Sequence, residues 1–425
     1  MNRRHWLECS LLAAAGAMTT MGRRVARAAA QPRIVIAGGG FAGSACALHL
    51  QQLNPSLDIQ LIDPIERYTT CPMSNEVIAG LRDLASLTVS RQGLRRAGVA
   101  VVRDRVERID AGRRRVELAG GSSLPYDRLV VAPGIRFLWE RIEGLNTQAA
   151  LRMPHAWMAG DQTARLAAQL RAMPDGGVVA ISVPAALMRC PPGPYERASL
   201  IAHFLKQSKP RSKILILDSN NSFPKQPQFT DAWNRLYPGM IEWIPMTQDG
   251  AVVRVDAASL TLFTASAAHR VSVANVIPPQ GPGALAPATG LASDHGWCPI
   301  DPSSFESINV SRVHVIGDAC IADAMPKSAS AAVSQAQHCA TAIDAVLSDR
   351  PVPEAPFDSV CYGRLSPALA LAFPGHFTVS DGRIVAPEPS APPQISLDTG
   401  VAARESVTAE RWYTDIRAQA FAARS

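Results

Sequence analysis

A glycine-rich segment near the beginning of the chain has the residue types and spacing of a dinucleotide-binding turn. Gly38, Gly40 and Gly43 fit the pattern G-x-G-x-x-G. In that pattern the first glycine allows a tight turn, the second lets the backbone approach a pyrophosphate, and the third lets a helix pack closely on a strand. Asp63 stands 20 residues beyond Gly43, where an acidic side chain can accept a hydrogen bond from a ribose hydroxyl. The alternative is a packing turn with spare glycines.

Cysteine is the second residue type that could do chemistry here. The chain has 8 cysteines in 425 residues, too few for a small disulfide-stapled scaffold. Cys190 precedes a turn into a predicted helix, whose N-terminus would stabilise a thiolate. Cys361 is distant in sequence and neither residue has a C-x-x-C partner, so the residues alone leave open whether the two are paired, structural or free. Four others are expected to be structural: Cys46, Cys298, Cys320 and Cys339.

The elements around the glycine turn form the unit that such a site requires. The apolar run 33–37 predicts a buried strand, 44–50 a helix, and 58–62 a second strand that ends at Asp63. Strand, turn, helix, strand and acid together are much more specific than the glycines alone. We therefore predict a dinucleotide site at this turn.

A second unit repeats this order without the glycines. Strands are predicted at 176–182 and 212–218 and a helix at 195–209. Between the first strand and the helix stands Val183-Pro-Ala-Ala-Leu-Met-Arg-Cys-Pro-Pro-Gly-Pro194. Proline has no N–H that could hold a phosphate, and the side chains block close approach of the backbone. The unit has the layout of a nicotinamide-nucleotide domain without its binding turn, and we do not expect it to use NADH.

Composition and the N-terminus indicate an exported globular protein. The chain is 47% hydrophobic and 18% charged, as expected for a protein of two or three domains. Residues 1–30 hold five arginines and one glutamate, and so account for +4 of the net charge of +6. The remainder gives no reason to propose nucleic-acid binding. Arg3-Arg4, a short apolar run and Ala28-Ala-Ala30 predict a twin-arginine signal and export to the periplasm; an uncleaved membrane anchor is the alternative.

Several longer segments carry a family resemblance that covers essentially all residues after 31. The chain resembles the flavoprotein subunit of flavocytochrome c sulfide dehydrogenase and, more distantly, sulfide:quinone oxidoreductase. The Cys190 segment is far more specific than the glycine motif. The resemblance rests on residues 68–76, 154–157, 189–198, 296–299, 305–307, 314–321, 325–328 and 361–362.

The resemblance implies FAD as cofactor. Cys71 matches the position that forms a thioether to the flavin, a tether that would prevent loss of a cofactor in the periplasm; a buried hydrophobic cysteine is the alternative. Gly317 and Asp318 match the element that holds the ribityl chain in flavoproteins of the glutathione-reductase type. Gly134 ends the strand that closes the first half of the flavin domain.

The resemblance also implies a redox site. Cys190 and Cys361 match the pair that forms a redox-active disulfide facing the flavin. Glu196 could accept a proton from HS⁻, and Lys327 could stabilise reduced, anionic flavin. For both charged residues a solvated or capping role is an equal alternative.

The expected fold is α/β, with two Rossmann-like dinucleotide-binding domains, one for FAD and one degenerate NAD-type domain, and a small C-terminal α+β domain. The expected divisions are 1–30 for the signal, 31–145 with 285–350 for the FAD-binding domain, 146–284 for the second domain and 351–425 for a C-terminal interface domain.

The implied function is oxidation of sulfide, with FAD passing electrons to haem. No C-x-x-C-H site occurs in the 425 residues, so the haem c is expected on a partner cytochrome c subunit. The nine histidines show no metal-ligand spacing, and no metal is predicted. The alternatives are an accessory redox flavoprotein of a thiosulfate-oxidising complex and a sulfide:quinone oxidoreductase. Against the latter, the C-terminal helix candidate 408–423 is short and charged, and no stable membrane insertion is expected.

Overall fold

A five-stranded parallel sheet lies at the centre of the first half of the protein, shown here by a computed structural model that describes residues 31–294, 296–388 and 394–422. Its strand order is β19-β9-β1-β2-β5, and every neighbouring pair is parallel. The predicted signal, residues 1–30, lies outside the described residues. The strands are β1 (Arg33–Ala37), β2 (Asp58–Ile62), β5 (Ala100–Val102), β9 (Arg128–Val131) and β19 (Val313–Val315).

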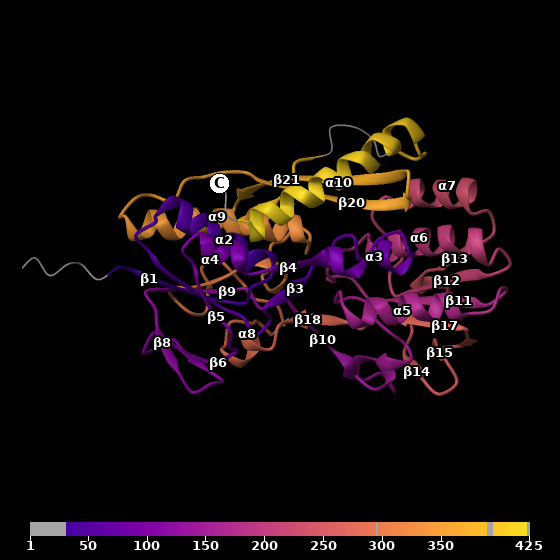
Figure 1. Ribbon diagram of the computed structural model, residues 1–425, viewed down its shortest axis with the longest axis horizontal. Helices are drawn as coiled ribbons and strands as arrows, with labels where there is room; N and C mark the ends of the chain where they lie inside the picture. The colour runs from indigo at the N-terminus through magenta and orange to yellow at the C-terminus, as the bar shows by residue number, and fades with distance from the viewer. Residues whose placement is uncertain (1–30, 295, 389–393, 423–425) are drawn as a thin grey trace, which may run out of the picture.

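Two helices from distant parts of the chain pack together beside this sheet (Figure 1). Helix α2 (Phe41–Leu53) is buried along most of its length and follows the glycine turn directly. Helix α9 (Ala329–Leu347) is capped by Ser328, whose hydroxyl accepts a hydrogen bond from Ala331 N at 3.1 Å. Because β19 and α9 return to a sheet started by residues 33–62, the first half is built from two separate stretches of sequence.

A four-stranded parallel sheet forms the second half, with the strand order β13-β12-β11-β17. The predicted β-α-β repeat is present, and helix α6 begins at Gly193, two residues before the predicted start. The strands are β11 (Val178–Val183), β12 (Lys213–Asp218), β13 (Ile241–Ile244) and β17 (Val273–Val276), and the helices are α5 (Asp161–Ala172), α6 (Gly193–Ser208) and α7 (Gln226–Leu236). With two parallel sheets flanked by helices, the predicted α/β class with two Rossmann-like units is confirmed.

Short antiparallel strands lie beside both sheets, and one pair of them lies between the two halves. Strands β10 (Ile135–Phe137) and β18 (Gln280–Pro282) pair where the chain passes between the halves. The remaining short elements of this part are β3 (Arg67–Thr69), β4 (Thr88–Ser90), β6 (Val106–Asp110), β7 (Arg115–Leu118), β8 (Ser123–Pro125), β14 (Arg254–Asp256), β15 (Thr261–Phe263), β16 (Ala268–Arg270), α3 (Ser74–Ile78), α4 (Gln92–Arg96) and α8 (Leu285–Ala288).

The C-terminal segment lies across both halves (Figure 1). A long hairpin of β20 (Phe357–Ser366) and β21 (Leu369–Ser380) is followed by β22 (Arg383–Val385) and α10 (Thr399–Phe421). The hairpin has no core of its own, because Phe357 and Phe377 join the core of the first half and Leu365 and Leu371 join that of the second. This position brings residues near 361 between the two halves.

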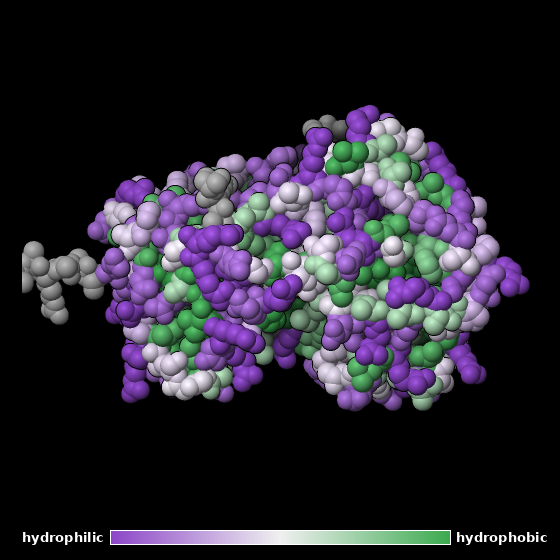
Figure 2. Space-filling model, viewed as in Figure 1, coloured by the Kyte–Doolittle hydropathy of each residue, from purple (hydrophilic) through white to green (hydrophobic). Residues whose placement is uncertain are grey.

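Helix α10 packs against the protein. It starts at Thr399, nine residues before the predicted start, because Asp398 caps it by accepting from Val401 N at 2.9 Å. Tyr413, Ile416 and Phe421 are buried in the core of the first half. Within the described residues, no helix is long and apolar enough to cross a membrane. Hydrophilic residues dominate the visible face, and a hollow separates the two halves at its lower edge (Figure 2).

Candidate functional site

Two cavities meet between the halves of the molecule. The larger, of about 730 Å³, is lined by the glycine turn and Asp63. The smaller, of about 170 Å³, is lined by three cysteines that come from distant parts of the chain. Both cavities are bordered by Gly40, Tyr68, Cys71, Ala132, Gly134 and Arg189. One elongated ligand could therefore extend from the turn to the cysteines.

The glycine turn has the geometry that a dinucleotide requires. Gly38 has φ +105°, and a Cβ at Gly43 would lie 1.9 Å from Gly38 O, so both positions need glycine. A Cβ at Gly40 would have its nearest neighbour at 3.9 Å, so this position borders open cavity. Asp63 accepts from Gly39 N at 2.5 Å and from Ile65 N at 2.7 Å. These residues fit FAD at this turn.

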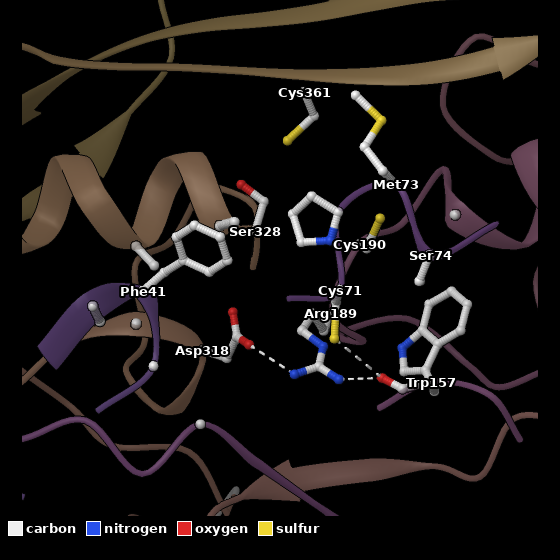
Figure 3. Close-up of a pocket in the computed structure, with 18 of the residues that line it drawn as sticks. Phe41, Cys71, Met73, Ser74, Trp157, Arg189, Cys190, Asp318, Ser328 and Cys361 are labelled. Carbon is white, nitrogen blue, oxygen red and sulfur yellow. Dashed lines mark hydrogen bonds and ion pairs between the residues drawn. The ribbon is translucent and has the colours of Figure 1, made fainter. Parts of the chain in front are cut away.

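Three thiols face the smaller cavity (Figure 3). Cys71 stands in the loop between β3 and α3, Cys190 in the loop before α6, and Cys361 on β20. Cys190 has φ +54° and its N–H donates to Lys327 O at 2.8 Å, which fixes the loop against the start of α9. All three thiols are free in this structure, so the Cys190–Cys361 disulfide and the flavin thioether of Cys71 stay predictions.

Burial disfavours ionisation of the Cys190 and Cys361 thiols. It raises the pKa of Cys190 well above the ordinary thiol value, with Cys361 and Glu196 adding to the effect. It also raises the pKa of Cys361 to about 11. Burial therefore opposes the Cys190 thiolate that the helix N-terminus was predicted to stabilise, and that stabilisation stays a prediction.

An arginine and an aspartate line the cavity together, with Arg189 beside Cys71, and with Cys361 on the other side (Figure 3). Gly317 and Asp318 lie on a short 3₁₀ turn after β19, and Asp318 Oδ2 stands 3.8 Å from Arg189 Nη1. Arg189 also donates to Trp157 O. Burial works against the charge of Arg189, but Cys71 and Asp318 outweigh it and raise its pKa. Sequence reasoning gave Arg189 no role, although it directly precedes Cys190 in the most specific segment.

Glu196 lines the smaller cavity beside Cys190. Its Oε2 accepts from Asn75 Nδ2 at 2.6 Å, and its Oε1 accepts from Arg364 N at 3.1 Å. Burial raises the pKa of this carboxyl to about 7, against the effect of the two hydrogen bonds. A group with this pKa can exchange protons at neutral pH, as a general base must.

Lys327 is not among the residues that line either cavity. Its Nζ donates to Asp318 O and Cys320 O, each at 2.8 Å, and stands 3.9 Å from the centre of the Trp297 ring. The lysine thus holds the turn that carries Asp318. These contacts agree with the capping role given above as one of two alternatives for Lys327, and its stabilisation of reduced flavin stays a prediction.

The other cysteines are packed away from the cavities. Cys46, Cys298, Cys320 and Cys339 are all fully buried in the core of the first half. Cys320 Sγ donates to Gly317 O at 3.2 Å and so supports the same turn as Lys327. Among the residues with assigned positions, no group of three or more His, Cys, Asp and Glu is arranged to hold a metal ion.

Two family models and a curated relative match parts of the chain. A family model described as the sulfide dehydrogenase (flavocytochrome c) flavoprotein chain, central, matches residues 163–278, and one described as pyridine nucleotide-disulphide oxidoreductase matches residues 32–168. A flavocytochrome c sulfide dehydrogenase flavoprotein chain of Chlorobaculum thiosulfatiphilum is 44% identical over 45 residues, which are 11% of this chain and 94% of that sequence.

Sulfide:quinone oxidoreductases match over a larger part of the chain. The mitochondrial enzyme of Dictyostelium discoideum is 22% identical over 313 residues, 72% of this chain and 68% of that protein. The X-ray structure of the Aquifex aeolicus enzyme has a TM-score of 0.70 at 17% identity and covers 92% of each chain. At that identity the structural likeness shows the fold.

The paired parallel sheets, the glycine turn and the two joined cavities define a flavoprotein of the pyridine nucleotide-disulphide oxidoreductase class. Within that class, the chain belongs to the family of sulfide-oxidising flavoproteins that includes the flavocytochrome c sulfide dehydrogenase flavoprotein chain and sulfide:quinone oxidoreductase.

NADH is expected to reduce the flavin at least about a hundredfold more slowly than sulfide, because two or more phosphate hydrogen bonds are missing. The N–H groups at the start of α6 are occupied internally: those of Tyr195 and Glu196 bind Pro192 O. Asp218, the acid that ends β12, is fully buried and accepts from Tyr195 Oη at 2.6 Å and Trp243 Nε1 at 2.8 Å. Anaerobic stopped-flow reduction by each donor checks this, and comparable rates would contradict it.

Proposed function

We propose that the protein is a periplasmic, FAD-dependent sulfide dehydrogenase that oxidises sulfide to sulfur or polysulfide and passes electrons to a cytochrome c subunit. The observation that carries the proposal is the meeting of Cys190 and Cys361 in one buried cavity beside Cys71. The two residues are separated by 171 positions in sequence, and only the C-terminal hairpin brings them together.

The chemistry would begin at a disulfide between Cys190 and Cys361. The sulfur of HS⁻ attacks one sulfur of this disulfide, a new S–S bond forms, and the old S–S bond breaks. One cysteine then carries a persulfide, and the other leaves as a thiolate with the electron pair. Glu196 would take the proton from the persulfide, since its pKa of about 7 lets it start ionised and finish protonated.

FAD would be held by the chain's own groups along the two cavities. The turn at Gly38, Gly40 and Gly43 would receive the pyrophosphate and Asp63 a ribose hydroxyl. Gly134, Gly317 and Asp318 line the smaller cavity or its border with the larger one. Cys71, which borders both cavities, would form the thioether. When bound, FAD supplies an acceptor for two electrons that can release them one at a time.

The electron acceptor is proposed to be a haem c on a separate subunit. The chain itself has no C-x-x-C-H segment, and one of its relatives is the flavoprotein chain of a flavocytochrome c. A quinone is the second candidate, because relatives that match most of the chain are sulfide:quinone oxidoreductases. Helix α10 packs its apolar side chains against the first half, where Tyr413, Ile416 and Phe421 are buried. These side chains are therefore not available to contact a membrane. Arg3-Arg4 and Ala28-Ala-Ala30 support export by the twin-arginine route.

Sulfide is expected to reduce the bound flavin, and cytochrome c to reoxidise it much faster than a soluble ubiquinone analogue does. The measurement is anaerobic reduction by sulfide, followed by mixing with each acceptor in separate stopped-flow experiments on the purified protein. Faster reoxidation by the quinone would favour the quinone reductase. An intact flavin that sulfide does not reduce would favour an accessory redox flavoprotein.

A further inference from the structure

Asn75 connects the candidate base to a buried arginine. It lies on α3 and lines the smaller cavity. Its Nδ2 donates to Glu196 Oε2 at 2.6 Å and to Gly193 O at 3.3 Å. Its Oδ1 accepts from Arg197 Nε at 2.9 Å. Both ends of the amide are therefore engaged with groups of the cavity wall.

The orientation of this amide follows from its partners. A guanidinium has donors only, so the amide atom that faces Arg197 must be the oxygen. The NH₂ group then has to point towards Glu196 and Gly193 O. A carboxylate that is ionised satisfies this donor, and Glu196 receives the hydrogen bond in a fixed direction. Arg197 thus determines that Asn75 presents its NH₂ group, and not its oxygen, to Glu196.

Arg197 is an unusual partner, because it is 2% exposed and, in the described part of the chain, its hydrogen bonds go to amide and backbone oxygens and not to a carboxylate. Its other N–H groups donate to His155 O, Ala156 O and Asn275 Oδ1. Burial lowers its pKa to about 10, and Glu196 is the leading negative group that opposes this, followed by Cys190. A buried cation without a contacting counter-ion is costly, so the negative charge of Glu196, relayed by Asn75, is its natural complement.

Other charged groups also face Glu196. Glu76 of α3 raises its pKa, while the guanidinium of Arg364 on β20 lowers it. Arg364 in turn forms ion pairs with Glu76 and Glu410. The thiols of Cys190 and Cys361 face the carboxyl from the loop and from β20. Among the residues that the structure describes, the Glu196 carboxyl accepts direct hydrogen bonds from Asn75 Nδ2 and Arg364 N.

We propose that Asn75 is a positioning residue for proton transfer: held by Arg197, it keeps the Glu196 carboxylate aimed and ionised beside the disulfide. The proposal rests on the proposed function. In the proposed reaction, Glu196 is protonated and loses the negative charge that balances Arg197. At the same step a thiolate is released in the same cavity. The negative charge thereby moves from the Glu196 carboxylate to sulfur, and the Arg197 guanidinium keeps an anion nearby.

The test is an infrared titration of the Glu196 carboxyl in the substrate-free holoprotein. The C=O band that is lost in Glu196→Gln identifies this group. In Asn75→Ala the ionised form loses a donor, so the midpoint is expected to rise by about one pH unit. In Asn75→Asp, which has nearly the same shape, a second carboxylate replaces the donor and the midpoint is expected to rise further. The acid limb of sulfide-driven flavin reduction should move to higher pH in parallel; sulfide's own ionisation contributes equally in every variant.

Asn275→Ala is the matched control. Asn275 is a buried asparagine whose Oδ1 accepts from the same Arg197 at 2.8 Å, and no hydrogen bond joins it to Glu196. We expect a lower Tm and an unchanged carboxyl midpoint. Midpoints in Asn75→Ala and Asn75→Asp that coincide with the wild-type value would overturn the proposal, as would an equal shift in Asn275→Ala. Wild-type rates in Glu196→Gln at all pH values would instead refute Glu196 as the base, which belongs to the proposed function.

Discussion

Replacing either Cys190 or Cys361 by serine is expected to abolish sulfide-driven flavin reduction, with a loss on the order of 10³-fold or more. If the two thiols form the disulfide that HS⁻ attacks, neither sulfur alone can relay an electron pair. The double variant should be no slower than either single one, because residues that act as a unit are strongly non-additive. Stopped-flow reduction by sulfide in the two single variants and the double variant measures this.

Two controls separate the relay from general damage. Dithionite needs no thiol relay and should reduce the flavin in all three variants. Cys46→Ala and Cys339→Ala remove buried core thiols that do not line the cavity and should keep near-normal turnover at some cost in stability. Near-normal sulfide rates in Cys361→Ser would break the mechanism. The thiol to examine next would then be Cys71, the third cysteine that lines the cavity.

Cys71→Ala is expected to change the flavin from bound covalently to fully extractable by acid. The fold should persist, because the turn at Gly38–Gly43 and the hydrogen bonds of Asp63 do not depend on the thiol. The measurement is the visible spectrum of supernatant and pellet after acid precipitation. In the wild type the flavin should stay with the pellet, and in the variant it should enter the supernatant.

A serine variant of Cys190 is the natural comparison for this experiment, because it alters a thiol of the same cavity without touching the proposed tether. Its flavin should stay in the pellet. Flavin that remains covalently attached in Cys71→Ala would show that another residue carries the thioether. Free flavin in both variants would indicate that the cofactor is bound without a covalent bond.

The first dinucleotide unit could be predicted from local sequence. The apolar runs that become β1 and β2, the three glycines and the terminal Asp63 are all signals that act within 31 residues. The second unit was predicted in the same way, and the prolines between residues 183 and 194 predicted that it lacks a phosphate-binding turn. Family resemblance then supplied the cysteine roles, which no local pattern carries.

The side chains around the cysteines depended on contacts between segments far apart in sequence. Helix α3 supplies Asn75, α6 supplies Glu196 and Arg197, and β20 supplies Arg364. No periodicity links these elements, because the hairpin reaches the cavity only by packing on both cores.

The sequence alone therefore determined the two β-α-β units, the dinucleotide turn and the family. The tertiary structure decided which groups are buried together and how they ionise. A pKa depends on the water and the charges within a few ångströms, and these come from the whole chain. For this reason the raised pKa of Cys190, the binding of Lys327 to backbone carbonyls and the hydrogen bond between Asn75 and Glu196 appear only in the folded chain.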